Sequence, residues 1–366
     1  MTFDNNVLRY DEQAIMRLRT LYRQYGYSQY RMSRFEEYSL YSENKAFLAS
    51  SEIITFTGGG GKLMALRPDV TLSIVKNTKD SGEMKKLYYN ENVYRSDGHE
   101  LKEQMQVGLE CIGDLDIYSM AEVLMLARKS LEIPGESAGN NAVSCIDISH
   151  MGFINGVMQS ENLNAEQSAE ILKRVSEKNV PGLNAICEQL GLSDRFRERA
   201  TTLAALYGSY DETFAGLRSL SDNKETDAAL HEIESIYNVL RRLGTEQGIN
   251  LDFSIVNDLN YYSGVIFQGY IEGVPTKVLS GGRYDTLLRK FGKSYGALGF
   301  AVYLDLLENL EPPRAGAEVD VLLQYDFDAV PELIADAVNS ITATGQSVQA
   351  RCGDPGDIKY KRIERL

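Results

Sequence analysis

The spacing of hydrophobic residues along this chain changes near residue 160 and changes back near residue 245. Strand-like runs, among them "KLYYNENVYR" and "QMQVGLECIG", fill much of residues 86–113, and others return at 251–282. Between these parts the apolar residues recur almost wholly at helical spacing, in runs that end at Gly or Pro. This order favours one sheet contributed by two separate parts of the chain, with a helical segment inserted between them.

We therefore predict an α+β fold with an antiparallel sheet of about six or more strands flanked by helices, because neighbouring strand-like runs look hairpin-linked. Helices are expected over residues 15–25, near 120–131 and from about residue 284. The tail after "EPPRAG" reads strand, helix, strand. The predicted core consists of residues 1–159 and 246–312, with a helical insertion between them at 160–245. A small C-terminal α/β module is predicted over residues 317–366.

Charge and hydropathy limit the partners and the compartment. The formal net charge of −14 argues against tRNA or another large RNA partner, because phosphate neutralisation supplies much of the affinity for nucleic acids. No apolar run approaches the roughly 20 residues that a membrane span needs. The polar start "MTFDNNVLRYDEQ" does not have the pattern of a signal peptide. We expect a cytoplasmic protein with no membrane partner.

The cysteines indicate neither zinc nor disulfides. They are far apart in the sequence and form no CxxC pair, a pattern typical of buried free thiols: Cys111, Cys145, Cys187 and Cys352. We therefore expect no metal and no cofactor.

The glycine cluster Gly58–Gly61, followed by Lys62, resembles a phosphate-binding loop only superficially. A P-loop requires a Gly five residues before its Gly-Lys pair and a Ser or Thr after the Lys, and Phe56 and Leu63 occupy those places. We interpret the cluster as the tip of a hairpin, since glycine favours turns.

Several polar motifs are scattered over the strand-like parts. They are "LRPDVT" at 66–71, "VYR" at 93–95, "QVGLE" at 106–110, "VNDLNYYSG" with its adjacent tyrosines, and "SGGRYD" at 280–285. Taken alone, the acids Asp69 and Glu110 could be structural ion-pair partners of Arg67 and Arg95, because buried carboxylates are costly unless they are paired.

Together and in this order, the motifs resemble the core of histidyl-tRNA synthetase, a class II aminoacyl-tRNA synthetase. "LRPDVT" is similar to the LRPEGT element of that family, and "VYRSDGHELKEQMQVGLECIG" is similar to its motif 2. "VNDLNYYSG" resembles the histidine motif RGLDYYTG, "SGGRYD" resembles GGRYD, and "GALGFAVYLDLL" resembles motif 3. The resemblance covers residues 8–150 and 246–310.

The resemblance implies a pocket for a histidine-like ligand. The residues at the matching positions supply acids for ammonium and imidazole N–H groups, with hydroxyls and an amide to complete the hydrogen bonds. They are Asp69, Thr71, Arg95, Gln106, Glu110, Tyr261 and Tyr262.

The cations that synthetases use for adenylation are missing. The Arg of the histidine motif falls on Asn257, the Arg of motif 3 falls on Leu306, and the Glu after the motif 2 Arg falls at best on Asp97. Because phosphoryl chemistry depends strongly on fixed positive charge, the resemblance implies that adenylation is lost. The loop between Arg95 and Gln106 is also short, and only about 50 residues follow Pro313 where synthetases carry an anticodon-binding domain.

A synthetase-like core with these losses resembles the family of ATP phosphoribosyltransferase regulatory subunits. That resemblance implies a non-catalytic subunit that activates the short-form catalytic subunit, at the first step of histidine biosynthesis, and helps couple it to histidine. It also implies a homodimer, built through residues near 30–60, within a hetero-oligomer that we expect to be a hetero-octamer. Two alternatives stay open: a divergent or truncated histidyl-tRNA synthetase-like enzyme, and a stand-alone histidine-binding sensor.

Overall fold

The computed structural model describes residues 8–48, 52–79, 83–96, 100–137, 142–256, 261–310 and 317–366. The chain divides into two compact units, Met1–Glu311 and Pro312–Leu366, which are treated separately below.

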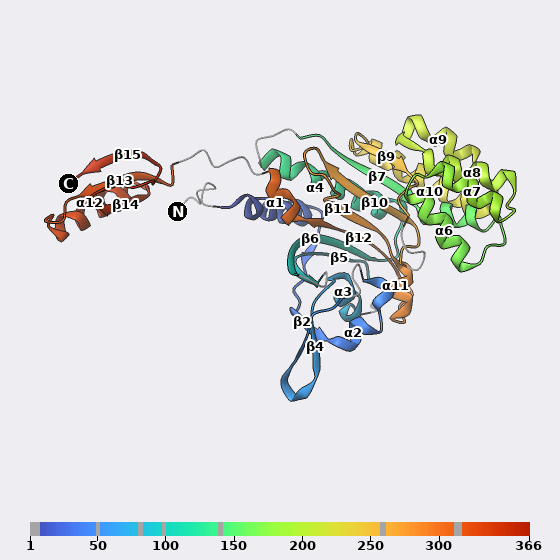
Figure 1. The fold of residues 1–366 in the computed structure, drawn as a ribbon, viewed down its shortest axis with the longest axis horizontal. Coiled ribbons are helices and arrows are strands. Elements are labelled where there is room, and N and C mark those ends of the chain that lie inside the picture. Colours follow the sequence, from blue (N-terminus) through green and yellow to red (C-terminus); the bar gives the residue numbers. More distant parts are fainter. Residues whose placement is uncertain are drawn as a thin grey trace. The chain divides into compact units, whose positions relative to one another are not determined.

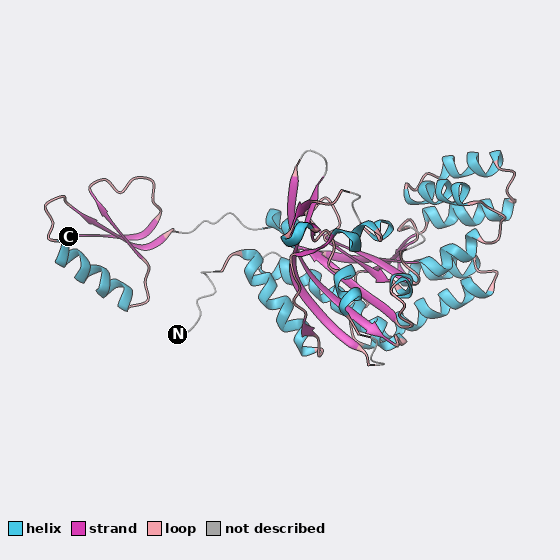
Figure 2. Cartoon of the chain, turned by 90° about the horizontal axis from the view of Figure 1, so that it is seen from below, coloured by secondary structure: helices cyan, strands magenta, loops and turns pink. Residues whose placement is uncertain are grey.

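The first unit is built around a large sheet (Figures 1 and 2), in which the described residues form nine strands. The strand order is β1-β5-β6-β12-β11-β10-β7-β9-β8. Their bounds are β1 Ser28–Gln29, β5 Lys85–Ser96, β6 Leu101–Gly113, β7 Ser144–His150, β8 Tyr207–Ser209, β9 Ile249–Asp252, β10 Val265–Ile271, β11 Leu279–Arg283 and β12 Gly296–Tyr303. From β5 to β7 in this order, all neighbours are antiparallel, which confirms the predicted antiparallel sheet.

Both margins of this sheet differ from the prediction. β1 runs parallel to β5, and β9 runs parallel to β7. A parallel neighbour requires a long crossover connection, and the helical segment between β7 and β9 provides it. β8 lies inside the segment predicted to be a helical insertion and pairs with β9. A strand of three residues carries too short a pattern to show in the sequence.

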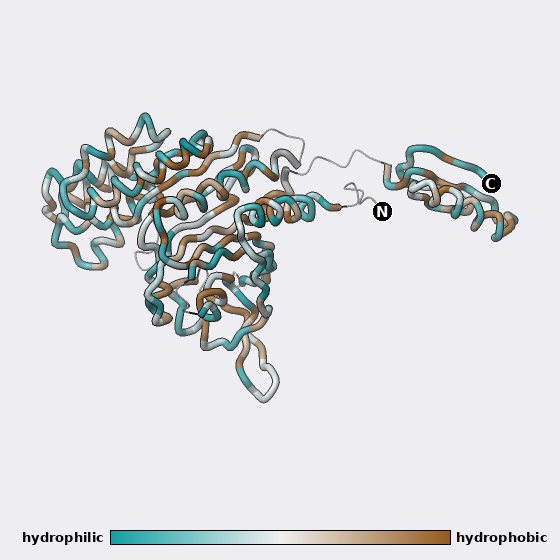
Figure 3. Tube along the Cα trace, turned by 180° about the vertical axis from the view of Figure 1, so that it is seen from behind, coloured by the Kyte–Doolittle hydropathy of each residue, from teal (hydrophilic) through white to brown (hydrophobic). Residues whose placement is uncertain are grey.

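Helices cover the sheet and form the insertion. Their bounds are α1 Tyr10–Gln24, α2 Tyr38–Ser42, α3 Thr71–Asn77, α4 Ile117–Ser137, α5 Met151–Met158, α6 Ala165–Ser176, α7 Val180–Gln189, α8 Asp194–Ala205, α9 Tyr210–Ser219, α10 Lys224–Arg242 and α11 Asp285–Lys290. α10 packs on α4 and α5, and α6 to α9 gather at the margin of the sheet formed by β9 and β8 (Figure 1). Figure 3 shows hydrophobic residues along the sheet strands and alternating with polar ones in the inserted helices.

Alternation along β6 separates the two faces of the sheet. Val107, Leu109 and Cys111 are buried in the larger hydrophobic core, which includes residues of α1 and α4. The residues between them point to the other face, since successive side chains on a strand alternate. Polar Gln106 and Glu110 therefore share the second face, where α3 and α11 contribute to a smaller core.

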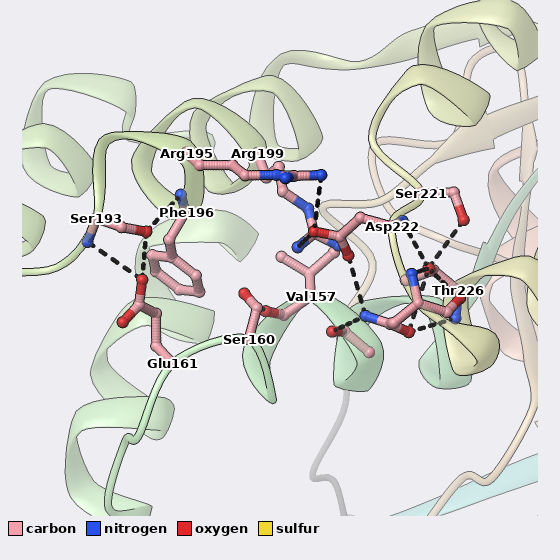
Figure 4. A network of polar contacts seen from close by, with 12 residues as sticks. Val157, Ser160, Glu161, Ser193, Arg195, Phe196, Arg199, Ser221, Asp222 and Thr226 are labelled. Atoms are coloured by element: carbon pink, nitrogen blue, oxygen red, sulfur yellow. Dashed lines mark hydrogen bonds and ion pairs between the residues drawn. The ribbon is translucent and has the colours of Figure 1, made fainter.

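A polar network fastens the inserted helices to α5 (Figure 4). Asp222, just before α10, forms ion pairs with Arg199 at 2.8 Å and with Arg195 at 3.2 Å. Asn223 caps α10 and donates to the carbonyl of Gly156 in α5 at 2.9 Å. At the other end, Ser193 caps α8 and donates to Glu161.

The glycine cluster lies in a hairpin turn, as predicted. β3 Thr55–Thr57 and β4 Leu63–Leu66 flank it and form a three-stranded sheet with β2 Phe35–Glu37. Lys62 pairs across this sheet with Glu37 at 2.6 Å rather than facing a phosphate-sized loop.

The second unit contains one more strand than predicted. β13 Val319–Tyr325, α12 Pro331–Ala343 and β14 Val348–Cys352 give the expected strand, helix, strand. β15 Tyr360–Arg365 then pairs parallel with β13, on the side opposite to β14. Its sequence "YKRIER" is largely charged, so its apolar signal was too weak to identify a strand.

The cysteines are free thiols, but they are not all buried. Cys111 and Cys187 are buried and Cys145 is half-buried, whereas Cys352 at the end of β14 is exposed, which corrects the prediction. In the part of the chain that the structure describes, no helix is long and apolar enough to cross a membrane. The same residues contain no His, Cys, Asp and Glu cluster suited to a metal ion.

Candidate ligand cavity

All seven residues predicted to form a ligand pocket line a single cavity of about 590 Å³ on the α3 face of the large sheet. They are Asp69, Thr71, Arg95, Gln106, Glu110, Tyr261 and Tyr262. Leu306, one of the two positions where an adenylation arginine is missing, lines the same cavity. The other such position, Asn257, lies outside the described residues, as does Asp97.

Glu110 is held on the cavity wall by hydroxyl groups. Its Oε1 accepts from Thr71 Oγ1 at 2.9 Å and its Oε2 accepts from the Tyr284 hydroxyl at 2.5 Å. Burial raises the pKa of Glu110 to about 8, although both hydroxyl hydrogen bonds favour the ionised form. No described cation forms an ion pair with it, so Glu110 is not half of a structural salt bridge.

Asp69 both stabilises the start of α3 and lines the cavity. Its Oδ1 accepts from the backbone N–H of Leu72 at 2.8 Å and so caps the first turn of α3. Burial raises the pKa of Asp69, and the Leu72 N–H and the Arg95 guanidinium partly offset that rise. The helix start brings Thr71 beside Glu110.

The two arginines near these acids have different roles. Arg67 is fully buried, and its two terminal guanidinium nitrogens bond to Glu91 at 2.9 Å and to the carbonyls of Ser33 and Asn92, so it is a structural ion-pair residue. Arg95 lines the cavity, and its Nε is buried without a hydrogen-bond partner among the described residues. The Nε of Arg67 also lacks a partner among the described residues, so what separates the two arginines is that Arg95 lines the cavity and Arg67 does not.

The tyrosine pair forms an aromatic wall. The rings of Tyr261 and Tyr262 meet edge to face with centroids 4.4 Å apart, and Tyr261 also packs near Phe47 at 5.8 Å. Burial raises the pKa of both phenols, which therefore stay protonated donors near neutral pH.

Glycines keep the floor of the cavity open. A Cβ at Gly299 would lie 1.8 Å from Glu110 Oε2, and one at Gly282 would lie 2.7 Å from the Tyr262 ring. A Cβ at Gly281 would lie 2.4 Å from the Gly299 carbonyl oxygen. A side chain at Gly282 or Gly299 would displace a group that lines the cavity, whereas one at Gly281 would clash with Phe267 and Phe300 of the larger core.

Several lining residues were not predicted from the sequence. Tyr284 belongs to the "SGGRYD" motif that was identified, but its hydrogen bond to Glu110 depends on the pairing of distant strands. Lys277, just before β11, and Gly299, in the motif 3 segment, carried no local pattern of their own. The cavity thus presents buried acids, phenol hydroxyls, two amides and two cations, a set suited to binding a small polar molecule.

A known protein family matches most of this chain. A sequence model of the histidyl-tRNA synthetase family matches residues 5–307. The chain is 30% identical to an ATP phosphoribosyltransferase regulatory subunit of Caldanaerobacter subterraneus subsp. tengcongensis, over 79% of this chain and 75% of that protein.

Solved structures of related description have a similar fold. A Bacillus halodurans protein, described as an ATP phosphoribosyltransferase regulatory subunit/histidyl-tRNA synthetase, matches with a TM-score of 0.82 at 25% identity, over 98% of this chain and 94% of that one. A chain of an ATP phosphoribosyl transferase complex from Thermotoga maritima matches in fold, with a TM-score of 0.63 at 17% identity, over 80% of this chain and 97% of that one.

Proposed function

Because this chain belongs to the histidyl-tRNA synthetase family and, within it, to the ATP phosphoribosyltransferase regulatory subunits, we propose that it activates a short-form ATP phosphoribosyltransferase catalytic subunit. The partner carries the catalytic residues for forming phosphoribosyl-ATP, and this chain helps couple the partner's activity to histidine. We expect the active form to be a hetero-octamer built on homodimers of this chain, with no tRNA partner.

The main support for this proposal is that the cavity keeps its ligand-binding residues while it lacks a cation needed for adenylation. The residues on its binding side are present, with Glu110, Thr71 and Gln106 positioned around open space. On the side where a synthetase needs positive charge for adenylation, Leu306 supplies an apolar side chain. Binding without catalysis is what a regulatory subunit requires.

The test is reconstitution. Co-expression with the short catalytic subunit should yield a stable complex, and adding this chain to the isolated catalytic subunit should raise its rate of phosphoribosyl-ATP formation. Added histidine should then lower that rate. Failure to co-purify and absence of activation would contradict the proposal and favour a stand-alone sensor.

The chain alone should not catalyse adenylation. We expect no histidine-dependent exchange of pyrophosphate into ATP, because the sequence has no arginine at 257 or 306 to stabilise the developing charge. The single substitution Asn257→Arg should not restore exchange. Robust exchange by the purified wild-type chain would support the synthetase-like enzyme instead.

The ligand of the cavity is proposed to be histidine, with Glu110 as an acceptor of its imidazole or ammonium N–H. Glu110→Ala should weaken histidine binding by about 1.5 to 3 kcal/mol, the range for a hydrogen bond to a charged group. Calorimetry on the isolated chain measures it. The matched control is Glu103→Ala, which removes an exposed Glu from the same strand outside the cavity. Equal affinity of wild type and Glu110→Ala would reject Glu110 as a ligand-binding residue.

A further inference from the structure

Lys277 is a cavity cation for which no acid partner is found in the described chain. Four charged side chains line the cavity, two acidic and two basic: Asp69, Glu110, Arg95 and Lys277. Arg95 is electrostatically coupled to Asp69, whose pKa it lowers. Lys277 is half-buried, and burial lowers the pKa of its ammonium with no described acid opposing that change.

The backbone beside Lys277 is fixed. The next residue, Val278, donates its N–H to the Gly269 carbonyl at 2.9 Å and accepts from the Tyr303 N–H at 2.8 Å. Lys277 therefore projects from an anchored strand start and not from a free loop. The anchored backbone fixes the point from which the Lys277 side chain extends.

Strand register places Lys277 and Glu110 at different ends of the cavity. Tyr303, whose N–H donates to the carbonyl of Val278, lies opposite Gln106 on β6. Glu110 lies opposite Gly299. Gln106 and Glu110 are four residues apart on β6, which corresponds to about 13 Å along a strand. The cavity thus has the carboxyl group of Glu110 at one end and an ammonium near the other.

From this arrangement we infer that Lys277 binds the carboxylate of the amino-acid ligand, in place of the cation that is missing at Asn257. The inference rests on the proposed function, in which histidine occupies the cavity. An α-carboxylate at Lys277 would supply the negative charge that the described chain does not, while the basic groups of the ligand face Glu110 and the phenols. Lys277 would then select amino acids over the corresponding amines.

Calorimetry with L-histidine and with histamine, which lacks the carboxylate, tests this role. Wild type should bind histidine at least about tenfold more tightly than histamine, as one charge-assisted contact implies. Lys277→Met should lose about tenfold or more in affinity for histidine and less than about twofold for histamine. Lys277→Arg, which keeps the charge, should retain most of the preference. The control Lys62→Met removes an exposed lysine in the hairpin outside the cavity and should change neither affinity.

Other outcomes overturn the inference in distinguishable ways. If Lys277→Met bound both ligands as tightly as wild type, or lost equal affinity for histidine and histamine, Lys277 would not contact the carboxylate. Binding of AMP that depends on Lys277, with no such dependence for histidine, would assign the site to a phosphate. If wild type binds neither histidine nor histamine, the inference and the histidine cavity both fail, while reconstitution with the catalytic subunit still decides the regulatory role.

Discussion

Replacing Gly299 with alanine should lower the free energy of unfolding by about 3 to 5 kcal/mol and abolish ligand binding in the cavity. The added Cβ would lie 1.8 Å from Glu110 Oε2 and 2.5 Å from the Leu109 carbonyl oxygen, and the backbone oxygen cannot move aside cheaply. Glu110 must then leave Thr71 and Tyr284, so overpacking is added to the loss of two buried hydrogen bonds.

Denaturant unfolding and calorimetry measure this effect. The matched control is Gly59→Ala in the β3–β4 turn, where an added Cβ meets nothing within 4 Å and the φ angle is not left-handed. It should change the free energy of unfolding by less than about 0.5 kcal/mol, the usual range for a neutral surface change. If Gly299→Ala were as stable as Gly59→Ala, the close packing of Glu110 over β12 would be wrong.

The parts of the fold that sequence reasoning found are those with long, regular patterns. The twelve and thirteen residues of β5 and β6 form a long hairpin, and the inserted helices carry clear periodicity and capping residues such as Asn223. β8, β9 and β15 are short or charged, and their pairing is set by distant partners. Local pattern cannot specify a contact whose other half lies about 40 to 100 residues away.

The candidate site divides in the same way. Its seven predicted residues stand within recognisable ordered motifs, and the structure brings all of them to one cavity. Tyr284 and Gly299 were missed because their importance appears only when β11 and β12 are placed beside β6. Lys277 was missed because a lone lysine in "GVPTKVLS" reads as a solvated surface residue until its burial is known.

The buried carboxyl of Glu110 should make stability depend on pH in a direction unusual for an acid. Its pKa is 4.5 in an ordinary setting and about 8 in the folded chain. Between these values the folded state keeps a proton that the unfolded state has released, so stability falls as pH rises from about 4.5 to about 8 and levels off above. Each pKa unit corresponds to about 1.4 kcal/mol, which puts the loss at no more than about 5 kcal/mol.

Glu110→Gln should remove this dependence, because a neutral amide of the same shape has no proton to release. The amide oxygen can accept from one of the Thr71 and Tyr284 hydroxyls, and its NH₂ group can donate to the other after that hydroxyl rotates. The variant should therefore exceed wild type in stability by several kcal/mol, up to about 5, at pH 8 to 9 and match it near pH 4.5. Denaturant titrations across this range, with Glu103→Gln on the exposed part of β6 as control, measure the difference. A variant that tracks wild type at every pH would mean that Glu110 is already ionised at neutral pH, held by its two hydroxyl donors despite burial.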